Sequence, residues 1–309
     1  MSEPPVVVLG DVMTDVIARM SGPLAPGSDT PSGIVTRPGG SAANTAAWLA
    51  HLGERVVFVG CVGDDAPGRE AAGALRSQGV TAALAVTDSA GTGTCIVLVD
   101  ASGERSMLPD AGANAHLGAG DLPLGAFAPG GHLHLSGYTL LRPGSRAAGL
   151  AALAAARRAG MTISLDPASA APLADMGAAG FQALAGRTDL LFVTPEEGEV
   201  LCGSRDPDAM GRHLLAGHAE VVLKRGSLGA DWRAGAGGEA HVPAAPPPGP
   251  VLDTTGAGDA FAAAFLAARR GGAGPEASLE RACALAARVA AQPGARPLSR
   301  PPPASRSPA

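Results

Sequence analysis

The sequence has 309 residues, of which 46% are apolar, 3% are aromatic and 17% are charged, and its formal net charge is −5 at pH 7. A chain of this length and apolar content can bury a large core, as one big α/β unit with an appendage, while the absence of a Lys- or Arg-rich run disfavours nucleic-acid binding. No apolar run approaches the roughly 20 residues that cross a bilayer, the acidic start is unlike a signal peptide, and four widely spaced cysteines are expected to be reduced thiols, so a cytoplasmic protein without membrane contact is expected.

Strands and helices are expected to alternate along the first eighty residues. The β-branched run at 6–9 predicts a buried strand, and the Ala-rich segment 41–52 predicts a helix that ends at Gly53. A second strand is expected at 55–62 and a second helix at 68–78. This alternation predicts a mostly parallel sheet with helices on both faces.

The alternation is interrupted at residues 92–108. Two apolar segments there flank a glycine-containing turn and predict a hairpin, which we expect to form a small separate sheet with material from 16–36. The alternation then resumes, with strands expected at 132–135, 162–165, 190–193 and 220–223, and helices at 145–158, 258–269 and 279–291. Residues 297–309 are rich in Pro and Ser and predict a disordered tail.

The most informative segment is Asp-Thr-Thr-Gly-Ala-Gly-Asp-Ala-Phe at 253–261. Small residues at 256–258 stand where an apolar helix begins, and the first N–H groups of a helix have no internal partner, so the turn suits a phosphate. A carboxylate at Asp259 would normally repel that phosphate, so its presence needs a reason, and general-base chemistry on a nucleophile that attacks phosphorus supplies one. The structural alternatives are a plain strand-to-helix turn, a helix N-terminal acid at Asp259 and a turn-forming Asx residue at Asp253.

Two more segments carry polar groups near predicted element ends. Gly39 and Gly40 precede a helix and allow close approach of a polyol, whose hydroxyls Asn44 can bind. The structural alternative is a Gly-Gly loop with Ser41 as the N-cap of the helix. Asp11 and Asp15 follow the first strand, at the sheet edge where open α/β sheets bind ligands. The structural alternative is that both are solvated acids in a loop.

Together these motifs resemble the PfkB family of carbohydrate kinases, which have the ribokinase-like fold. The likeness rests on Gly39-Gly40 with Asn44 and on residues 253–259, and it covers about residues 5–296. It implies a three-layer α/β kinase domain over 1–296, with a small β-sheet lid built from segments 16–36 and 92–108. The lid is expected to close over the sugar and to pair two subunits as a homodimer.

The resemblance also implies roles at matching positions. Asp259 is the expected catalytic base and Gly256, Ala257 and Gly258 the expected anion hole; the expected sugar contacts are Asp15, Gly39, Gly40, Asn44 and Asp253, and the expected nucleotide loop holds Lys224, Gly226 and Gly229. ATP and Mg²⁺ are the implied cofactors, with a monovalent cation such as K⁺ near the Asp253 loop.

One departure from the family pattern follows Thr194-Pro195. The family often has Asn-x-x-Glu there, associated with Mg²⁺ and phosphate, whereas this chain has Glu196 in the place of the Asn and Glu199 in the acidic position. A hard cation accepts a carboxylate or a water equally well, so Glu199 is still expected to serve Mg²⁺, directly or through water.

The sequence therefore predicts ATP-dependent phosphorylation of a hydroxyl, a primary alcohol, on a sugar such as a pentose or ketose. A nucleoside kinase of the same family is the alternative, but residues 92–110 contain no aromatic side chain to line a base pocket. An alternative of another class is a non-catalytic sugar- or nucleotide-binding regulator, which would have no need of Asp259. Specificity is expected to rest on lid and loop side chains, namely Arg105, Met107, Asp110, Asn114, Ser136 and Tyr138.

Overall fold

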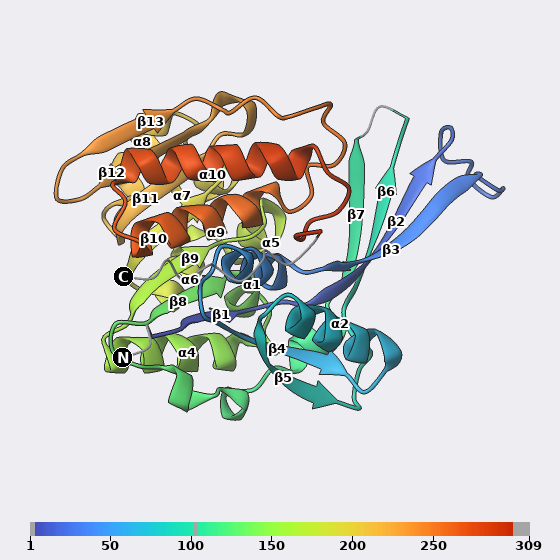
Figure 1. The fold of residues 1–309 in the computed structure, drawn as a ribbon, viewed down its shortest axis with the longest axis horizontal. Helices are drawn as coiled ribbons and strands as arrows, with labels where there is room; N and C mark the ends of the chain where they lie inside the picture. Colours follow the sequence, from blue (N-terminus) through green and yellow to red (C-terminus); the bar gives the residue numbers. More distant parts are fainter. Residues whose placement is uncertain (1–3, 102–103, 299–309) are drawn as a thin grey trace, which may run out of the picture.

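A nine-stranded sheet forms the centre of the computed structural model, which describes residues 4–101 and 104–298 (Figure 1). Its order is β13-β12-β11-β10-β9-β8-β1-β4-β5, parallel from β11 to β5, with β12 and β13 added as an antiparallel hairpin at one edge. The strands are β1 (Val6–Leu9), β4 (Val56–Gly63), β5 (Thr81–Thr87), β8 (His132–Ser136), β9 (Thr162–Asp166), β10 (Thr188–Val193), β11 (His218–Lys224), β12 (Ala230–Ala234) and β13 (Glu239–Val242).

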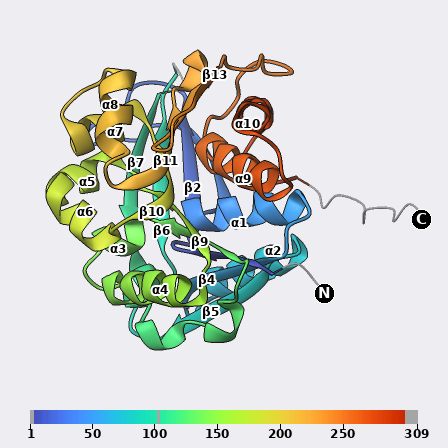
Figure 2. The same cartoon turned by 90° about the vertical axis from the view of Figure 1, so that its left-hand side faces the viewer.

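Helices cover both faces of this sheet and make the fold three-layered (Figure 2). One layer holds α1 (Ser41–His51), α2 (Ala66–Ser77), α9 (Ala257–Arg270) and α10 (Pro275–Ala290), and the other holds α3 (Tyr138–Leu141), α4 (Arg146–Ala159), α5 (Ala170–Met176), α6 (Ala178–Ala185), α7 (Pro195–Cys202) and α8 (Pro207–Leu214). Successive side chains of a strand point to opposite faces, so Val6 and Val8 enter one core while Val7 and Leu9 enter the other. This double burial explains the unbroken apolar run of β1.

A separate four-stranded sheet projects from the body (Figure 1). Its order is β3-β2-β6-β7, with β2 (Met13–Met20), β3 (Ser32–Gly39), β6 (Thr94–Val99) and β7 (Arg105–Asp110). Met13, Ile17 and Val97 are buried on one face, while the opposite face exposes apolar side chains such as Ile34, Ile96 and Leu108. The strands extend a few residues beyond the predicted lid segments 16–36 and 92–108.

The predicted parallel sheet, its helical layers and the hairpin near residue 100 are confirmed. The edge hairpin β12–β13, strand β5 and helices α5 to α8 were not predicted. The predicted tail at 297–309 lies outside the described residues from 299 onward. Within the described part of the chain, no helix is both long enough and apolar enough to cross a bilayer.

Candidate active site

Asp259 brings the two glycine-containing motifs together at the carboxyl ends of the central strands. It lies in the first turn of α9, and its two carboxylate oxygens each accept a hydrogen bond from α1. Ser41 Oγ donates to Oδ1 at 2.8 Å and Asn44 Nδ2 donates to Oδ2 at 2.9 Å. The carboxylate is therefore fixed in position by two residues that lie more than 200 positions earlier in the chain.

Asp11 explains why the Ser41 hydroxyl is available to Asp259. The N-cap of α1 is Gly40, which offers no side-chain cap and adopts a φ of 94°. The Asp11 carboxylate takes over that role from the end of β1, accepting from Ser41 N at 3.1 Å and from Ala42 N at 3.4 Å. The alternative in which Ser41 caps its own helix is therefore wrong, and Asp11 serves the helix start rather than standing as a solvated acid.

Burial places the titration of Asp259 near neutrality. Desolvation raises the pKa of this carboxyl to about 7, against the lowering effect of the hydrogen bonds from Asn44 and Ser41. The nearby Asp166 carboxylate raises the pKa further, and the Lys224 ammonium lowers it. A general base works best when its pKa lies near the operating pH, so the environment suits Asp259 to proton abstraction.

Lys224 places a positive charge beside the start of α9. Its Nζ lies 3.8 Å from the position that a β-carbon on Gly258 would occupy, and it pairs with Asp166 Oδ2 at 2.5 Å. Burial acts to lower the pKa of Lys224, but Asp166 and then Glu197 outweigh it and raise the pKa, so the side chain stays charged. Lys224, Asp166 and Asp259 thus form one partly buried cluster at the ends of β11, β9 and the α9 turn.

Sequence reasoning missed Asp166. A usable signal was present, because Asp166 ends a buried parallel strand in the same way as Asp11 follows β1, and ligand-binding groups gather at these carboxyl ends. Its other oxygen, Oδ1, accepts from Ala168 N at 3.1 Å. Ala168 adopts a φ of 74°, a conformation that disfavours a side chain, so the loop is strained beside the cluster.

The turn before α9 requires glycine at its centre. Gly256 has a φ of 78°, and a β-carbon there would lie 2.7 Å from Ala295 Cα. The N–H of Ala257 closes the turn on Thr254 O at 3.2 Å. Among the described residues, the N–H groups of Gly256 and Gly258 have no backbone acceptor, so both are available to a phosphate oxygen.

Asp253 connects this turn to the small sheet. Its Oδ1 accepts from Thr255 N at 2.9 Å, as the Asx alternative expected, and also pairs with Arg105 Nη2 at 2.8 Å. Arg105 belongs to β7 and reaches Thr254 Oγ1 as well, at 2.9 Å. A side chain of the small sheet therefore contacts the loop that leads into Asp259.

Asp15 presents an unpartnered carboxylate on β2. It is 8% exposed, and no described residue donates a hydrogen bond to it. Desolvation raises its pKa to about 6, against the lowering effect of Arg296. A β-carbon on Gly39 would overlap this carboxylate, and one on Gly40 would lie 2.6 Å from Asp11 O. The two glycines are thus needed for the chain to pass next to Asp11 and Asp15.

Glu199 does not join this cluster. Its side chain is 45% exposed and pairs with Arg205 Nε at 2.6 Å, whereas the buried carboxylate of α7 is Glu197, which closes a capping box with Thr194. Within the described residues there is no group of three metal-ligating side chains. Mg²⁺ bound to ATP usually retains several water ligands and needs only one or two carboxylates from the protein. The accessible carboxylate of Glu199 could be one of them.

The remaining predicted residues form the loop after β11. Gly226 and Gly229 have φ values of 56° and 90°, and a β-carbon on Gly229 would overlap Val242 O. Gly229 therefore lets β11 turn back into β12.

Asn114, which was expected to set specificity, forms hydrogen bonds with the backbone of Val12. Its Oδ1 accepts from Val12 N and its Nδ2 donates to Val12 O, at 2.9 Å each, so it supports the fold.

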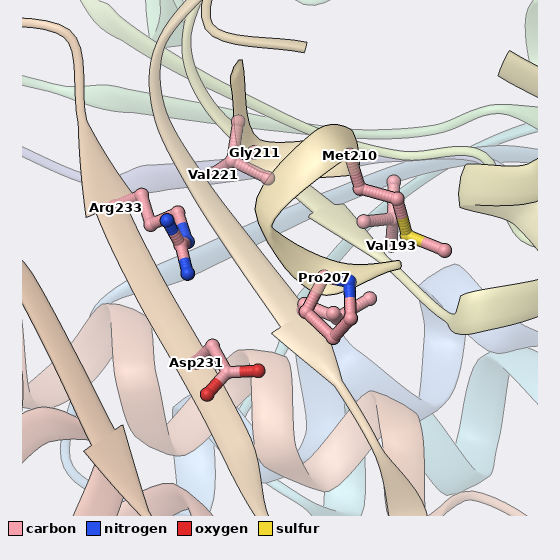
Figure 3. A pocket seen from close by; sticks show the side chains of 8 residues that line it. Val193, Pro207, Met210, Gly211, Val221, Asp231 and Arg233 are labelled. Atoms are coloured by element: carbon pink, nitrogen blue, oxygen red, sulfur yellow. The ribbon is translucent and has the colours of Figure 1, made fainter. Parts of the chain in front are cut away.

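Two other features carry no ligand site. His132 and His134 are buried and share the Ser164 hydroxyl, at 2.7 and 2.8 Å, which makes them core side chains. A pocket beneath α8, lined by Val193, Met210 and neighbouring side chains, has a volume of about 10 Å³ (Figure 3). That is room for about one water molecule, so this pocket is a packing defect.

The fold and the Asp259 cluster define a ribokinase-like kinase, and comparison with known proteins agrees. The model of the pfkB family carbohydrate kinases matches residues 4–301. The chain is 34% identical over 268 residues to a fructokinase of Klebsiella pneumoniae, covering 84% of this chain and 82% of that protein. It is 34% identical over 263 residues to an ATP-dependent ribose-1-phosphate kinase of Halopiger xanaduensis, covering 82% and 80%.

A solved structure shows the same architecture. The adenosine kinase from Sinorhizobium meliloti superposes with a TM-score of 0.84 at 26% identity, covering 97% of both chains. The chain therefore belongs to the pfkB family of carbohydrate kinases.

Proposed function

We propose that this kinase transfers the γ-phosphoryl group of ATP to a primary hydroxyl of a sugar such as a pentose or ketose. Asp259 is the general base, and the turn at 256–258 is the anion hole. The observation that carries the proposal is the Asp259 carboxylate, held on both oxygens by Ser41 and Asn44 and lying in one cluster with the Lys224 ammonium. No plain structural acid at a helix start needs that arrangement.

Each residue has a task in this reaction. Asp259 accepts the proton of the sugar hydroxyl as its oxygen attacks phosphorus, while Ser41 and Asn44 hold the carboxylate at the correct angle. The Gly258 N–H and the Lys224 ammonium face the negative charge of the transferring group, which is stabilised by preorganised donors rather than by covalent chemistry. Asp166 keeps Lys224 charged and in place.

The charges around the sugar side favour a neutral polyol over a sugar phosphate. The buried carboxylates there are Asp11, Asp15 and Asp253, and Asp259 adds a fourth acid. The cations near them are Arg105, Arg296 and Arg37, which lies opposite Asp15 on the neighbouring strand. Since Asp253 already pairs with Arg105, an anionic substituent would face an excess of carboxylates. Asp15 can instead accept hydroxyl hydrogens, with Gly39, Gly40 and Asn44 beside it.

The nucleotide side is proposed to use the loop after β11. Lys224, Gly226 and Gly229 would contact ATP, and Glu199 would hold the Mg²⁺ that accompanies the phosphates, which would supply positive charge beside them. The name of the Halopiger relative includes ATP as the donor. A monovalent cation near the Asp253 loop remains a proposal for the same region.

The small sheet is proposed to be the lid of a kinase domain spanning residues 1–296. Its contact from Arg105 to the Asp253 loop supports a position over the sugar, where a lid excludes water and prevents ATP hydrolysis. The exposed apolar side chains on the opposite face, including Ile34, Ile96 and Leu108, support pairing of two lids in a homodimer.

A nucleoside kinase is the second candidate. The similarity to an adenosine kinase structure favours it, while the absence of aromatic residues from 92–110 argues for a free sugar. The non-catalytic regulator loses its support, because the matched family is one of kinases.

A panel assay tests the proposed function. ADP release from ATP and Mg²⁺ is followed by a coupled assay with fructose, ribose, other pentoses and ketoses, ribose 1-phosphate and adenosine, each with and without K⁺. We expect the highest kcat/KM with a neutral sugar. Preference for adenosine would replace the proposal with the nucleoside kinase, and preference for ribose 1-phosphate would refute the charge argument.

A further inference from the structure

Arg296 lies beneath the two glycine motifs although it belongs to neither of them. It follows α10 near the end of the described chain and is only 6% exposed. Its Nε donates to Asn44 Oδ1 at 3.0 Å, and its Nη2 donates to Gly39 O at 2.6 Å. One guanidinium thus holds both the loop that precedes α1 and the side chain that contacts Asp259.

The segment that carries Arg296 is itself firmly anchored. Trp48 Nε1, in α1, donates to Ala295 O at 2.8 Å, and Gln292 Nε2 donates to Arg296 O at 3.0 Å. Ala295 packs against Gly256, where no β-carbon would fit. The guanidinium is therefore held rigidly relative to both α1 and the turn that begins α9.

Hydrogen-bond chemistry makes this contact directional. An arginine side chain has donors only, whereas an asparagine side chain has one accepting oxygen and one donating nitrogen. The Asn44 atom that faces Arg296 must therefore be Oδ1, which leaves Nδ2 to face the accepting carboxylate of Asp259. Without Arg296 the amide of Asn44 would be free to rotate and could turn its oxygen toward that carboxylate.

We propose that Arg296 is a positioning residue for phosphoryl transfer, which fixes the Asn44 amide so that Asn44 holds the Asp259 carboxylate in its reactive orientation. The proposal rests on the proposed role of Asp259 as the base. Arg296 acts through Asn44 and takes no proton itself.

The unpaired donor of Arg296 supports a role beyond packing. Its Nη1 is buried and has no hydrogen-bond partner among the described residues. Leaving a buried donor unpaired is costly, and nearly all such groups in proteins are paired. A side chain that served only the fold would be expected to have all its donors satisfied.

The positive charge of Arg296 also affects the titration of the carboxyl groups around it. Burial lowers the pKa of Arg296 to about 10, against the raising effect of Asp15, Asp259 and Asp11, so the group is a cation at neutral pH. The groups that face Asp259 are Asp166 from β9, Lys224 from β11, Tyr138 from α3 and Arg296 itself.

The same charge acts on Asp15, which faces Arg296, Asp11 and Asp253. Removing Arg296 withdraws the charge that lowers the pKa of Asp15 and loosens the Asn44 bond that lowers the pKa of Asp259. Both changes raise a carboxyl pKa, so the acid limb of the activity profile should move to higher pH.

A double-mutant cycle tests this inference. The variants are Arg296→Met, Asn44→Ala and the double variant, with Arg69→Met as control because Arg69 is an exposed arginine whose side-chain exposed fraction is 68%. We expect R296M to lower kcat/KM for the sugar on the order of 10- to 100-fold, the loss associated with a hydrogen bond to a charged group. R69M should match the wild type.

The coupling decides between positioning and an independent role. The cycle is measured at a pH above the acid limb, where the charge of Arg296 no longer changes the protonation of Asp15 and Asp259. If Arg296 acts through Asn44, the double variant should lose no more activity there than N44A alone. In a separate pH profile, R296M should shift the acid limb upward. Losses that multiply, or an R296M profile with an unmoved acid limb, would overturn the proposal. If thermal unfolding shows that R296M does not fold, Arg296→Lys replaces it, because lysine keeps the charge but not the planar pair of donors.

A crystal structure of the folded variant provides a readout that is independent of activity. We expect the Asn44 amide to leave Asp259 or to become disordered, while an unchanged contact with Asp259 Oδ2 would overturn the inference. If the wild type phosphorylates no sugar, the proposed function fails, whereas the structural result still decides whether Arg296 positions Asn44.

Discussion

Replacing Asp259 with Asn should abolish turnover and at the same time stabilise the protein at alkaline pH. Asn cannot accept the hydroxyl proton, and loss of a general base costs about 10²- to 10⁴-fold in rate, or about 3 to 5 kcal/mol of transition-state stabilisation. Binding of ATP should be nearly unchanged, because the predicted nucleotide contacts are Lys224, Gly226 and Gly229. D259N should therefore have a lower kcat and an unchanged affinity for ATP.

The stability change follows from the raised pKa of Asp259. A carboxyl whose pKa moves from its ordinary value of 3.8 to about 7 on folding disfavours the ionised folded form by about 4 kcal/mol. The folded state then binds more protons than the unfolded state between pH 4 and 7, so stability is lost as pH rises through 7. Asn avoids this cost and can keep both contacts, because its oxygen can accept from Asn44 Nδ2 while its nitrogen donates to the Ser41 hydroxyl, which accepts as well as donates.

The net expectation is a gain of up to about 4 kcal/mol in the free energy of unfolding of D259N at pH 8, with little or no gain at pH 4. Urea unfolding at both pH values, isothermal titration with ATP and steady-state kinetics measure the three quantities. Wild-type turnover in D259N would refute the role of Asp259 as base. A variant that is less stable than the wild type at pH 8 would refute the account of its burial.

Three further predictions concern neighbouring residues. In the wild type, kcat/KM should decrease below about pH 7 as Asp259 is protonated. Ser41→Ala should move this acid limb to higher pH, because the hydrogen bond from Ser41 lowers the pKa of Asp259. An unmoved limb in S41A would show that another group titrates. Lys224→Met should lower kcat about 10²- to 10³-fold, the typical loss of one oxyanion donor, while a change confined to the KM for ATP would limit Lys224 to binding. Ala168→Gly should raise the urea midpoint. Glycine relieves about 1 to 2 kcal/mol of strain in the left-handed backbone conformation, which exceeds the cost of its greater entropy in the unfolded state, about 0.4 to 1 kcal/mol. A lower midpoint would show that Ala168 is not strained.

The sequence predicted the parts of the fold whose signal is local. The buried strand β1, the helix α1 and the hairpin of β6 and β7 were all readable, since apolar runs, helical periodicity and a glycine turn each act over a few residues. The edge hairpin of β12 and β13 was missed because charged and polar residues such as Asp231, Arg233 and Glu239 interrupt the continuous apolar run that marks a parallel strand. Helices α5 to α8 are only seven or eight residues long. The start signals of α7 and α8, which are a capping box at Thr194 and an N-cap at Asp206, each followed by a proline, were overlooked.

The site was predictable only where its residues form a motif. Residues 253–259 and Gly39, Gly40 and Asn44 stand out along the chain, but Asp166 and Arg296 are single residues whose importance comes from contacts across the fold. Ser41 was considered only as a possible N-cap, in the structural alternative, because no local pattern shows that Asp11 from another element caps that helix. Tertiary contacts of this kind override local preferences.

Product analysis tests the central claim most directly. The purified kinase is incubated with ATP, Mg²⁺ and the best sugar of the panel, and phosphorus NMR identifies where the γ-phosphoryl group goes. The account predicts a phosphomonoester on the primary hydroxyl, formed in equal amount to ADP, and ester formation about 10²- to 10⁴-fold slower with D259N. ADP with free phosphate in place of the ester, or ester formation by D259N at the wild-type rate, would contradict it.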